Sequence, residues 1–409
     1  MIDIQRLQAE IDELAQITED VPPVVTRVLF SEQDLAAREW LKARCREAGL
    51  QLREDSVGNL FAAWPGIDPA RPAVGTGSHI DAIPNAGRYD GVVGVLGGLE
   101  AIRALQRSGY QPRRSIELIL FTSEEPTRFG IGCLGSRLMS GSLPLEDAFS
   151  FADQNGRTFA DWVAATPYPA NPHPRLDAGK YHAFVELHIE QGPILERENL
   201  DLGAVTHIAA PAAYRVRIEG EGGHAGGVLM PARRDALCGA AEFVLALEAN
   251  ARDSGSPDTV ATTGVIKAHP GAINSVPCLV EMEVDLRDIR LDTRTQTWER
   301  TLADLEAVCA RRGLRASTSV INEDPPATCD PKIVEATEAA AAKLSFSCRR
   351  MISRAYHDSL FMARIAPTSM IFIPCANGYS HRPDEFSSPE QIEKGVATLA
   401  EVLRQMADT

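Results

Sequence analysis

The sequence predicts an α/β fold in two domains, with the second domain inserted into the first. Short, almost entirely apolar runs such as 116-IELILF-121 alternate with helical patterns before residue 211 and again after residue 328, as in a sheet that helices cover on both faces. Between these regions the strands alternate strictly between apolar and polar residues, which indicates a sheet with one exposed face. A chain of 409 residues is also long enough for two domains that each bury a core.

Helices and strands alternate in the first half of the chain. The opening MIDIQRLQAEIDELAQ has the pattern of an amphipathic helix. A second helix is predicted over 31–49, where Ser31 is the N-cap, Asp34 completes a pattern like a capping box and Gly49 ends the helix. Further strands are predicted at 57–66, 72–79, 116–121 and 183–193, and a further helix at 91–109.

The region from residue 211 to residue 327 predicts a half-exposed antiparallel sheet with helices on one face. Its alternating segments are 214–220, 259–267 and 279–288, and its helical patterns are 231–250 and 293–313. After residue 328 the alternation of helices with an apolar strand resumes. The predicted elements there are a helix over 331–345, a strand over 369–374 and a terminal helix from Pro389. The predicted domains are therefore 1–210 together with 328–409, and the inserted 211–327.

The net charge and the cysteines of the sequence indicate which binding partners and which cellular compartment to expect. The net charge of −15 disfavours a nucleic acid or an anionic membrane as the main partner, because both favour surfaces rich in Lys and Arg. The longest apolar region, 91–102, is too short to span a bilayer, and the N-terminal segment lacks the features of a secretory signal. Eight scattered cysteines without a C-x-x-C pair suit reduced, structural thiols. We therefore expect a cytoplasmic protein that binds neither nucleic acid nor membrane.

Side chains that can coordinate a metal follow the predicted strands. Ligands bind at the carboxyl ends of the strands in open α/β sheets, so residues at these ends are expected to meet. Asp90 is predicted at the N-cap position of the helix over 91–109, where an anionic oxygen is well tolerated. The residues at or after strand ends are His79, Glu124, Glu125, His188 and His381.

This residue set indicates a metal site. Three imidazoles and two or three carboxylates without a thiolate suit Zn or Mn, and two ions could share one carboxylate. Each residue taken alone has an ordinary explanation, because a histidine near a strand end is mostly a satisfied polar residue and a pair of glutamates is mostly solvated surface. Five or six such residues at strand ends beside glycines are hard to obtain by chance, which favours the metal site.

The sequence resembles the M20 metallopeptidase-type amidohydrolases over essentially its whole length. Within that family it is similar to the branch of N-carbamoyl-L-amino acid hydrolases, allantoate amidohydrolases and ureidoglycolate amidohydrolases. The resemblance implies a discontinuous α/β catalytic domain that binds metal and an inserted α+β domain that acts as lid and dimerisation domain. The matching segments are GSHIDAIPNAGRYDGVVGVLGGLEA, FTSEEPTRFGIGCLGSR, ELHIEQGPILE, GEGGHAG, INSVP, DLRDI, YHDSLFMA and SHRPDEF.

The resemblance implies two divalent metal ions in each subunit. Manganese is favoured by the resemblance, although the same ligands accept Zn, Co or Ni. One ion would be bound by His79 and His188, the other by Glu125 and His381, and Asp90 would bridge both.

The resemblance also assigns the catalytic groups beside the metals. Glu124 would be the general base, and Asp81 would orient His79. In the inserted domain, His224 would stabilise the oxyanion.

Substrate contacts are expected from both domains. The resemblance makes Asn274 and Arg287 substrate contacts, with Arg287 as a carboxylate clamp, and some contacts would reach in from the partner subunit of a homodimer. A salt bridge with the acids at 281, 283 and 285, formed across strands, is an equal alternative for Arg287. Gln191 is a further expected substrate contact, and a plain turn residue is an equal alternative.

The segment 353-SRAYHDS-359 bears on the substrate. Many carbamoylases carry SGAGHDA at this point, so Arg354 and Tyr356 replace glycines and predict a smaller, more polar pocket. The segment is similar to that of plant-type ureidoglycolate amidohydrolase, and it places Tyr356 and His357 at the substrate. His357 and Asp358 are expected to support the site, with a buried structural pair as the alternative.

The predicted function is hydrolysis of (S)-ureidoglycolate to glyoxylate, ammonia and CO₂, with closure of the inserted domain over the metals. The alternatives are an N-carbamoyl-L-amino acid hydrolase or an allantoate amidohydrolase, and behind these a dipeptidase or an aminopeptidase. A relative without catalytic activity is a further alternative, but Glu124 beside all five ligands speaks against it.

Overall fold

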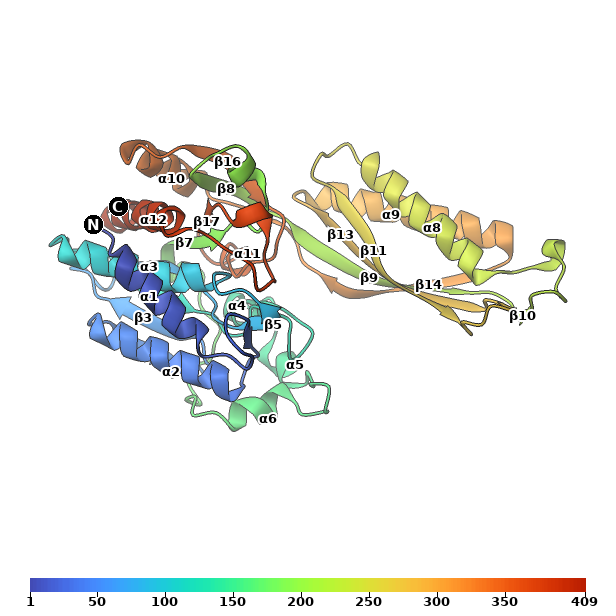
Figure 1. The fold of residues 1–409 in the computed structure, drawn as a ribbon, viewed down its shortest axis with the longest axis horizontal. Helices are drawn as coiled ribbons and strands as arrows, with labels where there is room; N and C mark the ends of the chain where they lie inside the picture. Colours follow the sequence, from blue (N-terminus) through green and yellow to red (C-terminus); the bar gives the residue numbers. More distant parts are fainter. The chain divides into compact units, whose positions relative to one another are not determined.

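The chain forms two compact units in a computed structural model that describes residues 1–409. The first unit contains Met1–His207 and Thr328–Thr409, and the second contains Ile208–Ala327. Both are drawn in Figure 1, where the second unit runs from green through yellow to orange. These bounds lie within a few residues of the expected ones, while the lid and dimerisation roles of the insertion stay predictions.

A nine-stranded mixed sheet forms the centre of the first unit. Its order is β15-β8-β17-β7-β4-β6-β3-β2, with β16 paired to β8. The neighbours β17, β7, β4 and β6 are parallel to one another, whereas β3 and β2 at one end and β8 at the other pair antiparallel. The bounds are β2 Gln51–Glu54, β3 Leu60–Trp64, β4 Ala73–Ser78, β6 Ile116–Leu120, β7 Tyr181–Ile189, β8 Leu202–Ile208, β15 Ala327–Thr328, β16 Cys348–Ser353 and β17 Thr368–Ile373.

Helices cover this sheet on both faces, so the predicted α/β fold is confirmed. On one face α1, α2, α3, α10 and α12 contribute to a single apolar core with the strands, and on the other face Met139 of α4 and Met362 of α11 pack against phenylalanines of the sheet. The bounds are α1 Ile4–Ala15, α2 Glu32–Glu47, α3 Val92–Arg107, α4 Leu134–Ser140, α10 Pro331–Lys343, α11 Ser359–Met362 and α12 Pro389–Asp408. The smaller elements are β1 Val25–Arg27, β5 Ala82–Ala86, α5 Leu145–Phe149, α6 Phe159–Ala164 and α7 Ile194–Arg197.

The start of α2 corrects one detail of the prediction. Ser31 is the N-cap, and its hydroxyl accepts a hydrogen bond from the backbone N–H of Asp34 at 3.2 Å. The Asp34 carboxylate does not complete a capping box. It accepts from the backbone N–H of Phe30 at 2.8 Å and pairs with Arg38, because a buried guanidinium four residues later needs a counter-charge.

The second unit is an antiparallel sheet with two helices on one face, as the alternating segments predicted. The order is β11-β13-β9-β14. Alternate residues of β13 are buried, and Val280, Met282, Val284 and Leu286 pack with α8 and α9 in one core. The bounds are β9 Ala210–Glu219, β10 Gly223–His224, α8 Ala236–Arg252, β11 Val260–His269, β12 Ser275–Val276, β13 Leu279–Asp288, α9 Leu291–Arg312 and β14 Arg315–Glu323, with 3₁₀ turns at Met230–Ala232 and Ala376–Gly378.

The two ends of the insertion are joined by a hydrogen bond within the first unit. The backbone N–H of Cys329 donates to the carbonyl of Thr206 at 2.9 Å. The chain therefore leaves the large sheet and re-enters it at neighbouring positions.

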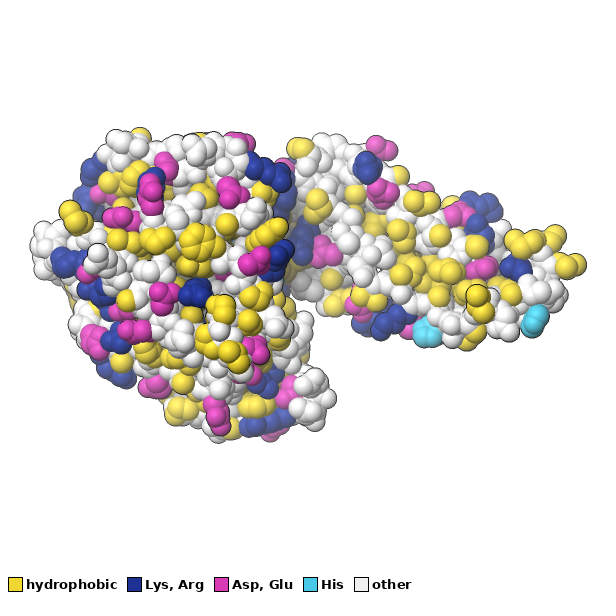
Figure 2. All heavy atoms as spheres, viewed as in Figure 1, with side chains coloured by type: hydrophobic (Ala, Val, Ile, Leu, Met, Phe, Trp, Pro, Cys, Tyr) yellow, Lys and Arg dark blue, Asp and Glu magenta, His cyan; other side chains and the backbone are white.

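The surface carries charged side chains of both signs, scattered between apolar ones on the face that Figure 2 shows. None of the helices combines the length and the apolar character that crossing a membrane requires.

Candidate metal centre and active site

The parallel order of β4, β6, β7 and β17 brings the predicted ligands to one region of the first unit. The carboxyl ends of parallel strands lie on the same edge of a sheet, which is why residues far apart in sequence meet there. Asp90 comes from the turn before α3. The others are His79 directly after β4, Glu124 and Glu125 after β6, His188 near the end of β7 and His381 in the loop after β17.

Asp90 lies between three imidazoles. Its Oδ1 is 3.1 Å from Nε2 of His188 and 3.6 Å from Nε2 of His79, and its Oδ2 is 3.3 Å from Nε2 of His381. Nε2 of His381 is in turn 3.4 Å from Oε1 of Glu125. In each of two groups, His79–Asp90–His188 and Asp90–Glu125–His381, the ligand atoms lie within 4.8 Å of one another. Asp90 is the member that the two groups share.

Two of the imidazoles are oriented by their second nitrogen. Nδ1 of His79 is 3.0 Å from the carbonyl of Asp81, and Nδ1 of His188 is 2.9 Å from the carbonyl of Ile189. A carbonyl can only accept, so each Nδ1 carries a hydrogen and each Nε2 faces Asp90, where it donates to the carboxylate when protonated and offers its lone pair to a cation when it is not. The backbone N–H of Gly91 lies 3.2 Å from Nε2 of His188 and donates to this nitrogen when it carries no proton. The donor set fits a divalent cation, because histidines that bind metal are held in this way.

The start of α3 shows that the predicted N-cap position of Asp90 is wrong. Gly91, not Asp90, is the N-cap, and no side chain caps the helix. Gly91 has φ +65, and a Cβ at this position would lie 2.4 Å from Nε2 of His79. Only glycine permits both the conformation and the close approach, so the side-chain cap is lost and the Asp90 carboxylate turns to the imidazoles instead.

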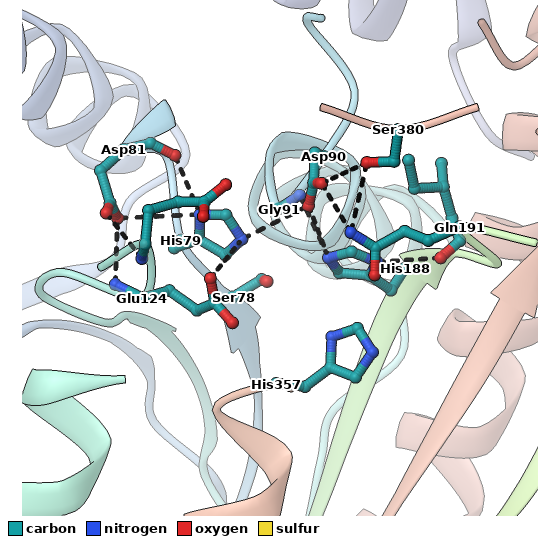
Figure 3. Close-up of polar contacts among 12 residues, drawn as sticks. Ser78, His79, Asp81, Asp90, Gly91, Glu124, His188, Gln191, His357 and Ser380 are labelled. Carbon is teal, nitrogen blue, oxygen red and sulfur yellow. Dashed lines mark hydrogen bonds and ion pairs between the residues drawn. The ribbon is translucent and has the colours of Figure 1, made fainter. Parts of the chain in front are cut away.

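Asp81 holds the Glu124–Glu125 turn with its carboxylate. Oδ1 accepts from the backbone N–H of Glu124 at 3.3 Å, and Oδ2 accepts from that of Glu125 at 3.0 Å (Figure 3). The carboxylate is 3.7 Å from Nδ1 of His79, farther than the Asp81 carbonyl. Asp81 thus contacts His79 mainly through its backbone, while its side chain fixes the two glutamates.

Glu124 is a buried carboxyl group beside this cluster. Its Oε2 is 3.7 Å from Nε2 of His79, and its Oε1 accepts from the thiol of Cys133 at 3.5 Å. Burial raises the pKa of Glu124 well above its ordinary value, despite the attraction of His79. A carboxyl group with a raised pKa next to ligand-type side chains is typical of a general acid or base. The Cys133 contact has no signal in the sequence, where the scattered cysteines predict structural thiols.

The charges of the cluster compensate one another. Burial alone would raise the pKa of Asp90, but hydrogen bonds from His188, His381 and His79 hold it well below its ordinary value. The hydrogen bond to Asp90 raises the pKa of His381 to about 9. Burial, followed by repulsion from Asp90, raises the pKa of Glu125 to about 7. At neutral pH the metal-free His381 therefore carries a proton opposite the ionised Asp90, and a bound cation would take the place of that proton.

Gln191 contacts the far side of Asp90. Its Nε2 donates to Oδ2 of Asp90 at 2.7 Å and to the hydroxyl of Ser380 at 3.2 Å (Figure 3). Its Oε1 is buried and has no hydrogen-bond partner. Gln191 also has φ +53, as a turn residue would. Gln191 therefore has the conformation of a turn residue and also a buried acceptor without a partner.

His357 and Tyr356 lie next to the cluster. The His357 ring meets that of His188 edge to face, with 4.5 Å between centroids, and its Nε2 is 2.9 Å from the hydroxyl of Ser353. Burial lowers the pKa of His357 well below its ordinary value, so the ring is neutral. The Tyr356 hydroxyl accepts from the Arg137 guanidinium at 3.2 Å.

A layer of buried carboxyl groups lies next to His357. Glu186 accepts from Ser78 at 2.7 Å and from the backbone N–H of Ser359 at 3.2 Å, and Asp358 accepts from Ser136. Burial and the proximity of Glu186 raise the pKa of Asp358 well above its ordinary value. Glu186, His188 and His357 also have ligand atoms within 4.8 Å of one another, but both oxygens of Glu186 already accept hydrogen bonds. The sequence did not single out Glu186, because it lies inside a buried strand.

The remaining predicted residues belong to the second unit. His224 and Asn274 are exposed at the paired strands β10 and β12, where the backbone N–H of Ala225 donates to the Asn274 carbonyl at 2.8 Å. Histidine side chains are visible on the surface of this unit in Figure 2. The Arg287 guanidinium forms a forked ion pair with Asp285, with N–O distances of 2.7 and 3.0 Å. This salt bridge runs along one strand.

Comparison with known proteins identifies the family. Residues 75–405 match Peptidase family M20/M25/M40. The chain belongs to this family. The family is metal-dependent, and the two groups around Asp90 are of a kind that can hold metal ions.

Individual members of the M20 family are similar to this chain over nearly its whole length. A ureidoglycolate hydrolase of Oryza sativa subsp. japonica is 51% identical over 99% of this chain and 85% of its own length. An N-carbamoyl-L-amino acid amidohydrolase of Geobacillus stearothermophilus is 35% identical over 100% of this chain and 99% of its own. The solved structure of AtUAH in complex with glyoxylate has 49% identity and a TM-score of 0.86, and covers 100% of this chain and 98% of that one. The predicted family and the predicted class of C–N bond hydrolase are confirmed.

Proposed function

We propose that this chain is a binuclear-metal amidohydrolase that hydrolyses (S)-ureidoglycolate. The single observation that carries the reaction type is Asp90, shared by two groups of ligand-type side chains, with the buried Glu124 3.7 Å from His79. The choice of substrate rests on the 51% identity to a ureidoglycolate hydrolase and on the likeness to AtUAH, which has been solved with glyoxylate and with (S)-hydroxyglycine.

The residues around Asp90 would hold the two ions. His79 and His188 would bind one ion, Glu125 and His381 the other, and Asp90 both. Divalent cations in such a site lower the pKa of water and polarise a carbonyl group. Manganese is the ion that we favour, with Zn, Co and Ni as alternatives that the same donors accept.

Glu124 would move the protons of the reaction. It takes a proton from the water that attacks the ureido carbonyl and passes it to the terminal nitrogen, which leaves as ammonia when its C–N bond breaks. The remaining carbamate loses CO₂ and leaves hydroxyglycine, whose C–N bond breaks to give glyoxylate and a second ammonia. The sum consumes one water for each ureidoglycolate. Asp81 would keep Glu124 in place through its hydrogen bond to the backbone N–H of that residue.

Neighbouring groups would recognise the substrate. The unpartnered Oε1 of Gln191 can accept a hydrogen bond from a ureido N–H, and Tyr356 and His357 would line the pocket. His224 would stabilise the oxyanion, while Asn274 and Arg287 would bind the substrate carboxylate. Arg287 would exchange Asp285 for that carboxylate, because its fork suits either partner.

We infer further that the enzyme acts as a homodimer in which the second unit supplies residues to the partner subunit's site. Large apolar side chains on the second unit are exposed, which is typical of a surface that a partner covers. They include Leu229, Met230, Leu245, Ile266 and Ile273.

A substrate panel tests the proposed function. Ureidoglycolate, allantoate, N-carbamoyl amino acids and a dipeptide are each assayed with the Mn-loaded protein, and ammonia release is measured. We expect the highest kcat/KM for (S)-ureidoglycolate, with glyoxylate as product. A higher kcat/KM for N-carbamoyl amino acids or for allantoate would instead indicate the activity of the N-carbamoyl-L-amino acid or allantoate amidohydrolases, which are less identical to this chain. Dipeptide cleavage without ammonia release would overturn the amidohydrolase proposal.

A further inference from the structure

Glu385 joins the two segments that supply Asp90 and His381. Its Oε1 accepts from the backbone N–H of Tyr89 at 2.8 Å and from that of Asp90 at 3.0 Å. Its Oε2 lies 3.0 Å from the hydroxyl oxygen of Ser380. The side chain is buried, with 4% of the residue exposed. One carboxylate therefore fixes both the turn before α3 and the loop after β17.

Ser380 extends this link to the Asp90 side chain. Its hydroxyl is 2.6 Å from Oδ2 of Asp90, the oxygen that also faces His381 (Figure 3 shows Ser380 against Asp90). Asp90 is thus held at its backbone by Glu385 directly and at its carboxylate through Ser380. His381 follows Ser380 in the chain and has φ +60, so its position depends on the same loop.

The turn before α3 leaves room for this carboxylate. A Cβ at Gly87 would lie 2.4 Å from Cβ of Glu385 and 2.7 Å from its Oε1, so any larger residue would displace Glu385. A second contact joins the same two segments, because the rings of Tyr89 and Phe386 meet edge to face with 5.9 Å between centroids. This aromatic contact can hold the loop in place when the carboxylate is removed.

We propose that Glu385 is a positioning residue that sets the separation of Asp90 and His381, and so the affinity of that pair for a divalent cation. The inference deepens the proposed function, since it rests on Asp90 and His381 as metal ligands. Glu385 does not touch the cation or the substrate in this proposal. It acts through its hydrogen bonds from two backbone N–H groups and through its contact with the Ser380 hydroxyl. Removing a residue that holds a metal ligand typically changes the metal affinity by about 10- to 100-fold.

The test compares Glu385→Ala with Glu385→Gln. The glutamine amide keeps an oxygen for the two backbone N–H groups and offers its NH₂ to the Ser380 hydroxyl, whereas alanine leaves those N–H groups without an acceptor. Affinity for Mn²⁺ and Co²⁺ is measured by competition with a chelator, and the Co²⁺ protein is examined by ligand-field absorption. We expect Glu385→Ala to lose about 10- to 100-fold in affinity and to change the Co²⁺ spectrum. Glu385→Gln should stay within a few-fold of wild type, with the wild-type spectrum.

Two further variants separate positioning from folding. Asp153→Ala is the matched control, because Asp153 is also a buried carboxylate that accepts from two backbone N–H groups, at 2.8 Å from Asn155 and 3.0 Å from Arg157. It should lower the melting temperature but leave the metal affinity unchanged. If Glu385→Ala does not fold, Glu385→Asp takes its place, because the shorter side chain cannot reach both segments and should also weaken metal binding.

The outcomes distinguish this inference from the proposed function. A folded Glu385→Ala or Glu385→Asp protein that binds both ions as wild type does, with an unchanged Co²⁺ spectrum, overturns the inference alone. A wild-type protein that binds neither ion overturns the proposed metal site together with it. The inference is supported if Glu385→Ala loses metal affinity while Glu385→Gln and Asp153→Ala both keep it.

Discussion

The two carboxylate oxygens of Asp90 have different partners. Oδ1 faces His79 and His188, and Oδ2 faces His381 and accepts hydrogen bonds from Gln191 and Ser380. Each oxygen thus belongs to one of the two ligand groups. Glu124 has no place in either group, and its raised pKa makes it a proton acceptor of suitable strength once the histidines hold a metal.

Glu124→Gln should separate catalysis from metal binding. Gln cannot take up the proton of the attacking water, so we expect ammonia release to fall by about 10²- to 10⁴-fold. The metal content should stay at the wild-type level, because both ligand groups are intact. Ammonia assays and metal analysis of the purified variant check this. Glu47→Gln on the surface is the control, and wild-type turnover in Glu124→Gln would show that the base is assigned wrongly.

Metal affinity should rise with pH. The pKa of His381 is raised to about 9 by its hydrogen bond to Asp90, so the metal-free protein carries a proton there below that pH. A cation must displace this proton, and the apparent affinity should therefore increase at least about tenfold per pH unit up to about pH 9. Despite burial, Glu124 and Asp90 also raise the pKa of His79, and Asp90 raises that of His188, so protons on these imidazoles steepen the dependence. Below about pH 7 the slope should steepen, because Glu125, with a pKa of about 7, is then protonated as well.

Titration of the metal-free protein with Mn²⁺ at a series of pH values measures this dependence. The control is the His381 pKa itself, measured by NMR in the metal-free protein and in metal-free Asp90→Asn, where it should fall because the hydrogen-bonding carboxylate is gone. An affinity that does not change with pH would show that the histidines are already unprotonated.

At the scale of elements, four parallel strands and the start of α3 position the cluster. The strands deliver His79, Glu124 and His188 to one edge of the sheet, and α3 must approach closely enough for Asp90 to reach them. The approach depends on Gly91. The geometry of a helix start, and not only the ligand residues, therefore determines whether the cluster forms.

Gly91→Ala should damage the site more than its backbone strain alone explains. Gly109→Ala is a matched control, because Gly109 also has a positive φ, +77, but a Cβ there would meet nothing within 4 Å. The control should cost about 1–2 kcal/mol of unfolding free energy through strain. Gly91→Ala should cost more, because its Cβ would collide with His79, and should also weaken Mn²⁺ binding. Equal losses in the two variants, measured by denaturant unfolding and metal titration, would contradict this explanation.

The strength of the sequence signal differed between elements. Buried strands such as β6 were predicted closely because they are almost entirely apolar, and long helices such as α12 because their apolar residues repeat at helical spacing. The edge strand β14 was not predicted, since nearly all its residues are exposed and carry no alternation. Asp90 was placed at an N-cap because its position relative to the helix suggested it, whereas the contact between Gly91 and His79 exists only in the folded chain.

Residues around the cluster likewise could not be predicted where their contacts form only in the folded chain. The ligand-type residues could be found because imidazoles and carboxylates after strands are unusual. Ser380, Glu385 and Cys133 carry no such signal, since their contacts join segments that only the fold brings together.

At the scale of the whole molecule, the active protein is expected to contain two chains. If His224 serves the partner subunit's site, a mixed dimer of Glu124→Gln and His224→Ala chains has one site with both defects and one site with none. Unfolding and refolding the two inactive variants together should therefore restore activity, up to about a quarter of wild type, because half of the dimers are mixed and half of their sites are intact.

Refolding each variant alone is the control, and size analysis establishes the dimer. No gain on mixing would show that His224 acts within its own chain or not at all.

The hydrogen bond between Cys329 and Thr206 indicates that the inserted unit can be deleted from the chain. Because the chain leaves and re-enters the large sheet at adjacent positions, a short hairpin turn can replace residues 208–327 without stretching the remaining backbone. We expect the excised protein, studied by circular dichroism and Mn²⁺ titration, to fold and to bind metal without turning over substrate. The insertion would then be an exchangeable cassette, free to change its sequence for new substrates while the hydrolytic centre is kept.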